Sequence, residues 1–126
     1  MNLENGFIED LKQILKELDN EIEKIEIEGE TAPESFDKVT QTLELTAGMF
    51  KIIGGSAIFE IIIDLKEYII STFASKKILN KEILSIIKSL CKNLKKIQTA
   101  EKLSDELIKK MADNYEKEAK KSNLPL

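Results

Sequence analysis

Residues 7–25 read FIEDLKQILKELDNEIEKI, and the spacing of the apolar residues in this stretch decides the fold class. Apolar side chains recur at steps of three and four, which is the repeat of an α-helix that buries one face. Charged residues fill most of the positions between them. The apolar positions of this repeat are Phe7, Leu11, Ile14, Leu18, Ile22 and Ile25. The pattern predicts an amphipathic helix over residues 3–27 that needs other helices to cover it.

Four more stretches follow with the same repeat, separated by short segments that contain turn-forming residues. The expected helices run from about Thr31 to Gly54, over residues 56–74, from Asn80 to about Ile97, and from Thr99 onward. The expected capping residues are Thr31, Ser56, Asn80 and Thr99. Residues 57–63 also suit a β-strand by residue type, but the length of the run and its helical neighbours favour a helix. Five helices with short connections predict an all-α fold, an antiparallel four-helix bundle with an additional terminal helix.

The composition limits both the size of the fold and its chemistry. A chain of 126 residues is long enough for one sizeable core, so we expect a single domain over residues 1–126. The absence of histidine removes imidazole bases and His-containing metal sites. The only cysteine, Cys91, excludes an intramolecular disulfide. The common catalytic templates are missing, so we expect no enzymatic activity, no cofactor and no metal.

Charge and hydropathy argue against nucleic acid and against a membrane as partners. The net charge is −4, and the basic residues are all lysine, whereas phosphate recognition relies on clustered cations and on arginine. We therefore expect no nucleic acid partner. Residues 49–63 form the most apolar stretch, but it contains Lys51 and Glu60 and is shorter than the ~20 residues of a spanning helix. Because the first ten residues do not resemble a signal peptide, the expected location is cytoplasmic.

The second predicted helix carries a polar stripe along one side. Projection at about 100° per residue places Glu44 near the centre of this stripe. The residues proposed to face solvent here are Asp37, Thr40, Gln41, Glu44, Gly48 and Lys51. Apolar residues lie on both sides of the stripe, so we expect the helix to be wedged between its neighbours and to expose only a narrow strip. Leu45 and Met49 are accordingly expected in the core.

Residues 44–54 read ELTAGMFKIIG and resemble the motif of histidine phosphotransfer (HPt) domains. In that family the stretch is His-x-x-Lys-Gly-x-x-x-x-x-Gly, with the phosphorylated histidine in the middle of an exposed helical face. The two glycines of the motif match Gly48 and Gly54. The register continues without a gap through residues 65–70 and 79–83, so the resemblance covers about residues 36–97. It is closest to the amino-terminal domain of chemotaxis kinases.

The departures from the motif bear on function. Glu44 replaces the phosphorylated histidine, and Ala47 replaces the lysine three residues later. Because phosphotransfer in this family requires a nitrogen nucleophile, we expect that chemistry to be lost. Members of the family often carry a glutamate on the next helix that bonds the histidine, and the ungapped register puts Lys66 there. We therefore predict an ion pair between Lys66 and Glu44, worth at most ~1 kcal/mol if it is exposed.

Two functions follow as hypotheses. The resemblance implies a non-catalytic, HPt-like interaction module in two-component or chemotaxis signalling. Its partner would be a response-regulator receiver domain or a histidine kinase. The residues expected to bind this partner are Gln41, Glu44, Gly48, Lys51 and Lys66. The alternative is a structural or assembly protein, such as a homo-oligomer subunit or a chaperone-like adaptor, which shares only the bundle geometry.

Three other groups of residues carry less specific signals. Glu60, Asp64 and Glu67 form an acidic stripe on the third predicted helix, which we expect to be a solvated face rather than a metal site. Cys91 is expected to be a buried, inert thiol. The lysine-rich segments 92–96 and 117–121 are expected to be solvated helix faces.

Overall fold

The computed structural model describes residues 3–77, 79–99 and 104–121. The described chain is almost entirely helical. Its elements are α1 (Leu3–Glu28), α2 (Pro33–Ile52), α3 (Ser56–Lys76), α4 (Lys81–Leu94), the short 3₁₀ helix η1 (Lys95–Thr99) and α5 (Asp105–Lys120). No strand occurs among these described residues, and residues 57–63 are part of α3. The predicted all-α bundle is confirmed.

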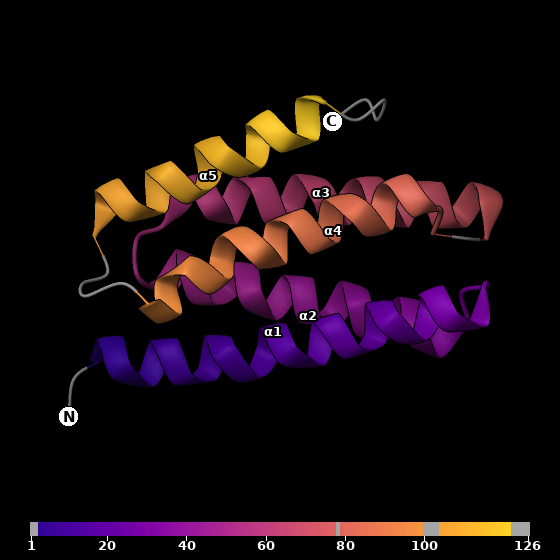
Figure 1. Cartoon of the computed structure of the whole chain (residues 1–126), viewed down its shortest axis with the longest axis horizontal. Helices are drawn as coiled ribbons and strands as arrows, with labels where there is room; N and C mark the ends of the chain where they lie inside the picture. The colour runs from indigo at the N-terminus through magenta and orange to yellow at the C-terminus, as the bar shows by residue number, and fades with distance from the viewer. Residues whose placement is uncertain (1–2, 78, 100–103, 122–126) are drawn as a thin grey trace.

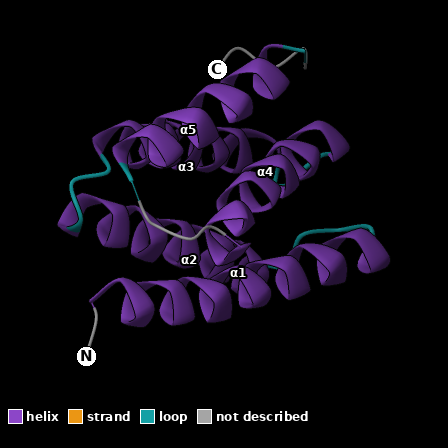
Figure 2. Ribbon diagram, turned by 60° about the vertical axis from the view of Figure 1, so that its left-hand side comes forward, coloured by secondary structure: helices purple, strands orange, loops and turns teal. Residues whose placement is uncertain are grey.

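Successive helices run in opposite directions along the bundle (Figure 1). Helix α2 packs between α1 and α3, while α4 packs against α1. Helix α5, the additional terminal helix, packs on both α3 and α4. Figures 1 and 2 both place α4 on one side of the α2–α3 pair, so the outer surface of α2 lies on the opposite side of the molecule. Within the part of the chain that the structure describes, this arrangement leaves one side of α2 without a covering helix.

The core is built from the apolar faces that the helical repeats predict. Leu11, Leu18 and Ile22 of α1 are almost completely buried, and so are Leu43 and Phe50 of α2. Aromatic rings fix both ends of α2 to its neighbours. The ring centroids of Phe7 and Phe50 lie 5.2 Å apart in an edge-to-face arrangement, and those of Phe36 and Phe73 lie 4.0 Å apart in a stack. Such pairs contribute about 0.5–1.5 kcal/mol beyond the area they bury.

Of the two capping predictions that concern α4 and α5, one is confirmed and one is wrong. The predicted cap of α4 is confirmed, because the Asn80 side chain accepts a hydrogen bond of 3.0 Å from the Ile83 N–H. The prediction that Thr99 caps the last helix is wrong. Thr99 ends η1, and Ser104 caps α5 by accepting a hydrogen bond of 3.1 Å from the Leu107 N–H. Ser104 has the advantage that two acidic residues follow it in the first turn, where they favour a helix start.

The other two capping predictions are also wrong. Helix α2 starts with a proline, which takes the first helical position, so the capping position falls on Ala32 rather than Thr31. The buried Thr31 hydroxyl instead accepts a hydrogen bond of 3.1 Å from the Leu79 N–H, which ties the α1–α2 turn to the start of α4. Gly55 occupies the capping position of α3 in the tight turn after α2, which makes Ser56 the first helical residue.

Candidate functional site

The polar stripe of α2 lies on the outer surface of the bundle. Gln41, Glu44 and Lys51 are exposed, and Gly48 between them is partly exposed. A Cβ atom placed on Gly48 would meet nothing within 4 Å outside the helix itself, so the space above this residue is open. The prediction that this stripe faces solvent is confirmed. The flat site at Gly48 lets another backbone approach α2 closely.

Glu44 forms the predicted ion pair with Lys66 of α3. The distance between Lys66 Nζ and Glu44 Oε1 is 3.7 Å. The Lys66 side chain is 19% exposed and that of Glu44 is 67% exposed, so the lysine stem lies along the α2–α3 interface while its ammonium reaches the surface. The pair stabilises the fold by no more than ~1 kcal/mol, because water screens it. Its main effect is to place opposite charges of α2 and α3 side by side on the surface.

The position of this pair follows from the short turn between α2 and α3. Glu44 lies eleven residues before Gly55, and Lys66 lies eleven residues after it. In an antiparallel helix pair joined by a tight turn, residues equally far from the turn lie side by side. Lys51 and Phe59, each four residues from Gly55, obey the same rule, and the Lys51 ammonium lies 5.3 Å from the centre of the Phe59 ring. Helix α3 thus supplies one edge of the site.

The other edge of the stripe differs from the prediction. Leu45 is 57% exposed and Ile52 is 87% exposed, and Met49 between them is only partly buried. The expectations that Leu45 belongs to the core and that α2 exposes only a narrow strip are therefore wrong. The physical reason is that α1 and α3 pack on the inner side of α2, and among the described residues no other helix packs closely on it. An apolar ridge consisting of Leu45, Met49 and Ile52 runs beside the polar stripe.

Sequence reasoning missed this ridge because nothing local separates an exposed leucine from a buried one. The apolar residues of α2 surround most of its circumference, which is more than two neighbouring helices cover. This excess of apolar surface on α2 could have indicated the ridge, because it requires either a third helix packed on α2 or an exposed apolar flank. The neighbours of α2 in the bundle decide between the two.

The second departure from the family motif also has a structural side. Ala47 is completely buried, whereas Glu44 three residues earlier is exposed. A lysine at the position of Ala47 would have to extend along the helix for its ammonium to reach water. The exposed face therefore runs along Gln41, Glu44 and Gly48 and does not include position 47.

The acidic residues of α3 and the single cysteine do not form a metal-binding or reactive site in the part of the chain that the structure describes. Glu60, Asp64 and Glu67 are exposed on α3, and within residues 3–77, 79–99 and 104–121 no three acidic or cysteine side chains are grouped to hold a metal ion. Cys91 is buried, as predicted. Burial raises the pKa of its thiol to about 12, and the nearby Asp19 carboxylate adds to this increase. The thiol therefore stays protonated at neutral pH.

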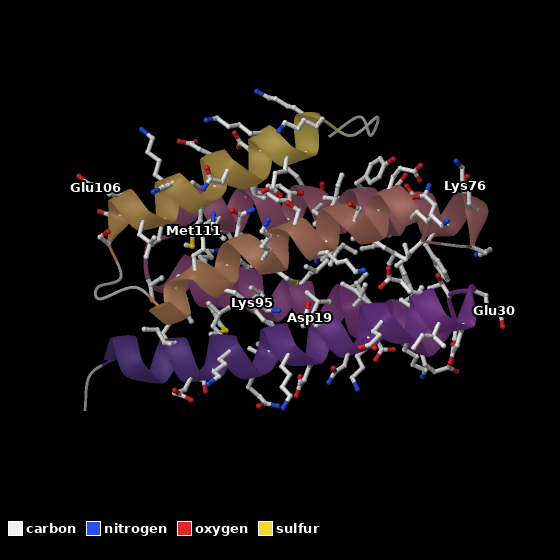
Figure 3. The ribbon with its side chains drawn as sticks, viewed as in Figure 1. Asp19, Glu30, Lys76, Lys95, Glu106 and Met111 are labelled. Carbon is white, nitrogen blue, oxygen red and sulfur yellow. The ribbon has the colours of Figure 1, made fainter. Side chains whose placement is uncertain are left out.

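Lys88 of α4 and Lys95 of η1 each form an ion pair with α1. Figure 3 shows Lys95 and Asp19 close together between η1 and α1, where they form an ion pair. Lys88 forms a second pair with Glu26, at 2.7 Å.

In the described ranges no helix has the length and apolar character needed to cross a membrane.

Comparison with protein-family models, with curated proteins and with solved structures found no match for this chain. The resemblance to HPt domains therefore depends on the spacing of Gly48 and Gly54 and on the ungapped register that follows them. Assignment to that family stays a prediction.

Proposed function

We propose that this chain is a non-catalytic, HPt-like interaction module of two-component or chemotaxis signalling. It binds a response-regulator receiver domain or a histidine kinase and transfers no phosphoryl group. The binding site is the α2 face, which we define as Gln41, Glu44, Gly48, Lys51 and Lys66 together with the apolar ridge. The observation that supports this proposal most strongly is the apolar ridge beside an ordered charge pair, on a helix side that the fold leaves uncovered.

The chemistry of Glu44 favours binding over transfer. The residue stands where HPt domains carry the phosphorylated histidine, and the chain contains no histidine elsewhere to take over that role. A carboxylate acceptor would have to form an acyl phosphate, which receiver domains achieve only with an acidic pocket that binds a metal. Glu44 is paired instead with Lys66, and Gly48 follows it one helical turn later. A fixed negative charge in this place attracts a cationic group of a partner.

The apolar ridge supplies what the charges lack. Rim charges mainly steer association, whereas affinity comes from apolar side chains that become buried. Ile52 and Leu45 are the two most exposed apolar residues on α2 and lie on one flank, seven residues apart. A partner that covers one helix face and part of α3 buries less area than a standard interface of about 800 Å² per partner. We therefore expect a transient complex that dissociates readily.

A second candidate function is assembly. Exposed leucine and isoleucine seven residues apart also occur where helices of separate subunits pack together. In this case the HPt likeness would reflect bundle geometry alone, and the chain would be a subunit of a homo-oligomer or a chaperone-like adaptor. The two candidates differ in the protein that occupies the α2 face.

A pull-down from the native cell tests the proposal. The baits are the wild-type chain, Glu44→Lys, and Glu23→Lys as a matched control, because Glu23 is exposed on α1 and its reversal changes the net charge equally. We expect a receiver-domain protein or histidine kinase with the wild type and with Glu23→Lys, and a strong loss with Glu44→Lys. Purified partner should reproduce this order in a titration.

Two results would contradict the proposal. Equal recovery of the signalling protein by all three baits would place the interface away from Glu44. Recovery of further copies of the chain itself, with no receiver or kinase, would favour assembly instead.

A further inference from the structure

The α2 face has an internal symmetry about Gly48. Glu44 lies four residues before Gly48 and Lys51 three residues after it. At about 100° per residue, both project to the same side of Gly48, at about 40° and about 60°. Leu45 and Ile52 project to the other side, at about 60° and about 40°. Reversing the direction of the helix about Gly48 therefore exchanges Glu44 with Lys51 on one edge and Leu45 with Ile52 on the other.

A second copy of the chain fits this pattern. When two α2 helices pack face to face and antiparallel about a two-fold axis at Gly48, each edge of one helix meets the same edge of the other. Glu44 then lies opposite the partner's Lys51, with an offset along the axis of only one residue, or about 1.5 Å. Leu45 lies opposite the partner's Ile52. Because the interface is two-fold symmetric, each of these contacts occurs twice.

We infer that the chain self-associates through the α2 face as an antiparallel, two-fold dimer centred on Gly48. Two features of the single chain, the open space at Gly48 and the pair of Glu44 and Lys66, are compatible with this dimer. The space above Gly48 is open, so the two helices can approach closely. Lys66, 3.7 Å from Glu44, contacts one side of this carboxylate, and the 67% exposed Glu44 side chain leaves room for the partner's Lys51 on the other.

The opposite orientation lacks this complementarity. In a parallel two-fold pair the charged edge of one helix would meet the apolar edge of the other. Glu44 would then lie against aliphatic side chains and lose water without gaining a partner, which is unfavourable for a charged group. Charge and apolarity together therefore select the antiparallel dimer.

The dimer adds regulation to the proposed function. It covers the same residues that we propose for the receiver or kinase, so a chain in the dimer could not bind that partner. This regulatory consequence rests on the proposed function, whereas the dimer itself can be tested with the purified chain alone. Since one helix face forms a small interface, we expect dissociation constants on the order of 10–100 µM.

Sedimentation equilibrium with charge-reversal variants tests the inference. The full chain is measured from about 5 to about 500 µM, a range chosen to bracket that affinity. We expect the wild type to dimerise, and Glu44→Lys and Lys51→Glu to bind themselves at least about tenfold more weakly, because each variant places like charges at both crossings. An equimolar mixture of the two variants should form a mixed dimer, in which opposite charges meet again. Circular dichroism verifies that each variant is folded.

Gly48→Gln provides an independent measurement. Glutamine forms helices well and meets open space in the single chain, so the variant should be at least as resistant to urea as the wild type. Its longer side chain would separate the two helices, so dimerisation should fall at least about tenfold. Glu23→Lys is again the control and should dimerise like the wild type.

Three results would overturn the inference. They are a wild type that stays monomeric up to about 500 µM, a mixture of the two variants that is no more associated than either alone, and a Gly48→Gln variant that dimerises normally. None of them bears on receiver binding, which is measured separately with the chain at low concentration. Failure of the dimer and failure of the proposed function are therefore distinguishable.

Discussion

Replacing Gly48 by alanine should stabilise the folded chain. Gly48 is helical and lies in the interior of α2, where glycine costs about 1 kcal/mol relative to alanine because it loses more backbone freedom on folding. A Cβ atom at this position meets nothing within 4 Å, so no clash offsets the gain. We therefore expect the free energy of unfolding of Gly48→Ala to rise by about 1 kcal/mol. For a chain of this length the midpoint temperature should rise by about 4 °C.

Two neighbouring glycines provide matched controls with the opposite sign. Gly54 has a φ of +82°, a conformation that costs an alanine about 1–2 kcal/mol. At Gly55 a Cβ would lie 3.1 Å from Cδ1 of Phe50 and 3.3 Å from its carbonyl oxygen. The ring sits in the core, so neither atom can move away cheaply. Gly54→Ala and Gly55→Ala should therefore each lower the free energy of unfolding by about 1 kcal/mol or more.

Urea unfolding followed by circular dichroism measures all three variants. A protein concentration of about 2 µM keeps self-association, which we expect only at higher concentration, out of the comparison. If Gly48→Ala unfolded at the same or a lower urea concentration than the wild type, Gly48 would not lie on an open helix surface. The reasoning behind the α2 face would then be refuted. If Gly54→Ala were neutral, the left-handed turn after α2 would be refuted.

Three further predictions concern the contacts around this face and the core. Thr31→Val should lower the free energy of unfolding by about 1–3 kcal/mol, since it leaves the Leu79 N–H without an acceptor. If urea unfolding showed no loss of stability, the hydrogen bond between the α1–α2 turn and the start of α4 would be contradicted. The pKa of the Cys91 thiol is raised to about 12 in the folded chain, so the unfolded chain loses this proton first as the pH rises. The free energy of unfolding of the wild type relative to Cys91→Ala should therefore be constant at neutral pH and fall as the pH rises above about 9. A relative free energy that rose above this pH would contradict the burial of the thiol. A double-mutant cycle on Glu44 and Lys66, with each changed to glutamine, should give a coupling of no more than ~1 kcal/mol in urea unfolding at low salt, and a larger value would mean that the pair is shielded from water.

Much of the fold could be predicted from local pattern. The repeat in residues 7–25 predicted α1 almost to its ends, and the turn residues separated the later helices. Asn80 was correctly predicted as a cap because its side chain and its helix are neighbours in sequence. Thr31 was not, because its hydroxyl bonds to a residue 48 positions away. Capping preferences describe only what a side chain can do within its own turn.

The candidate site shows the same division. The pair of Glu44 and Lys66 was predicted from the register of the family that the sequence resembles, and the tight turn at Gly54 and Gly55 explains why α3 returns along α2 in that register. The exposure of Leu45 and Ile52 could not be predicted, because it depends on where α4 and α5 pack. These two helices cover α1 and α3 and leave the outer flank of α2 open.

Local spacing in the chain was therefore enough to define five helices, and composition was enough to exclude imidazole chemistry and an intramolecular disulfide. Period and turn chemistry act between residues that are close in sequence, so they can be read without coordinates. Which apolar flank meets water was decided only when all the helices packed together. Burial depends on every neighbour at once, and the same leucine is core or surface according to whether another helix covers it.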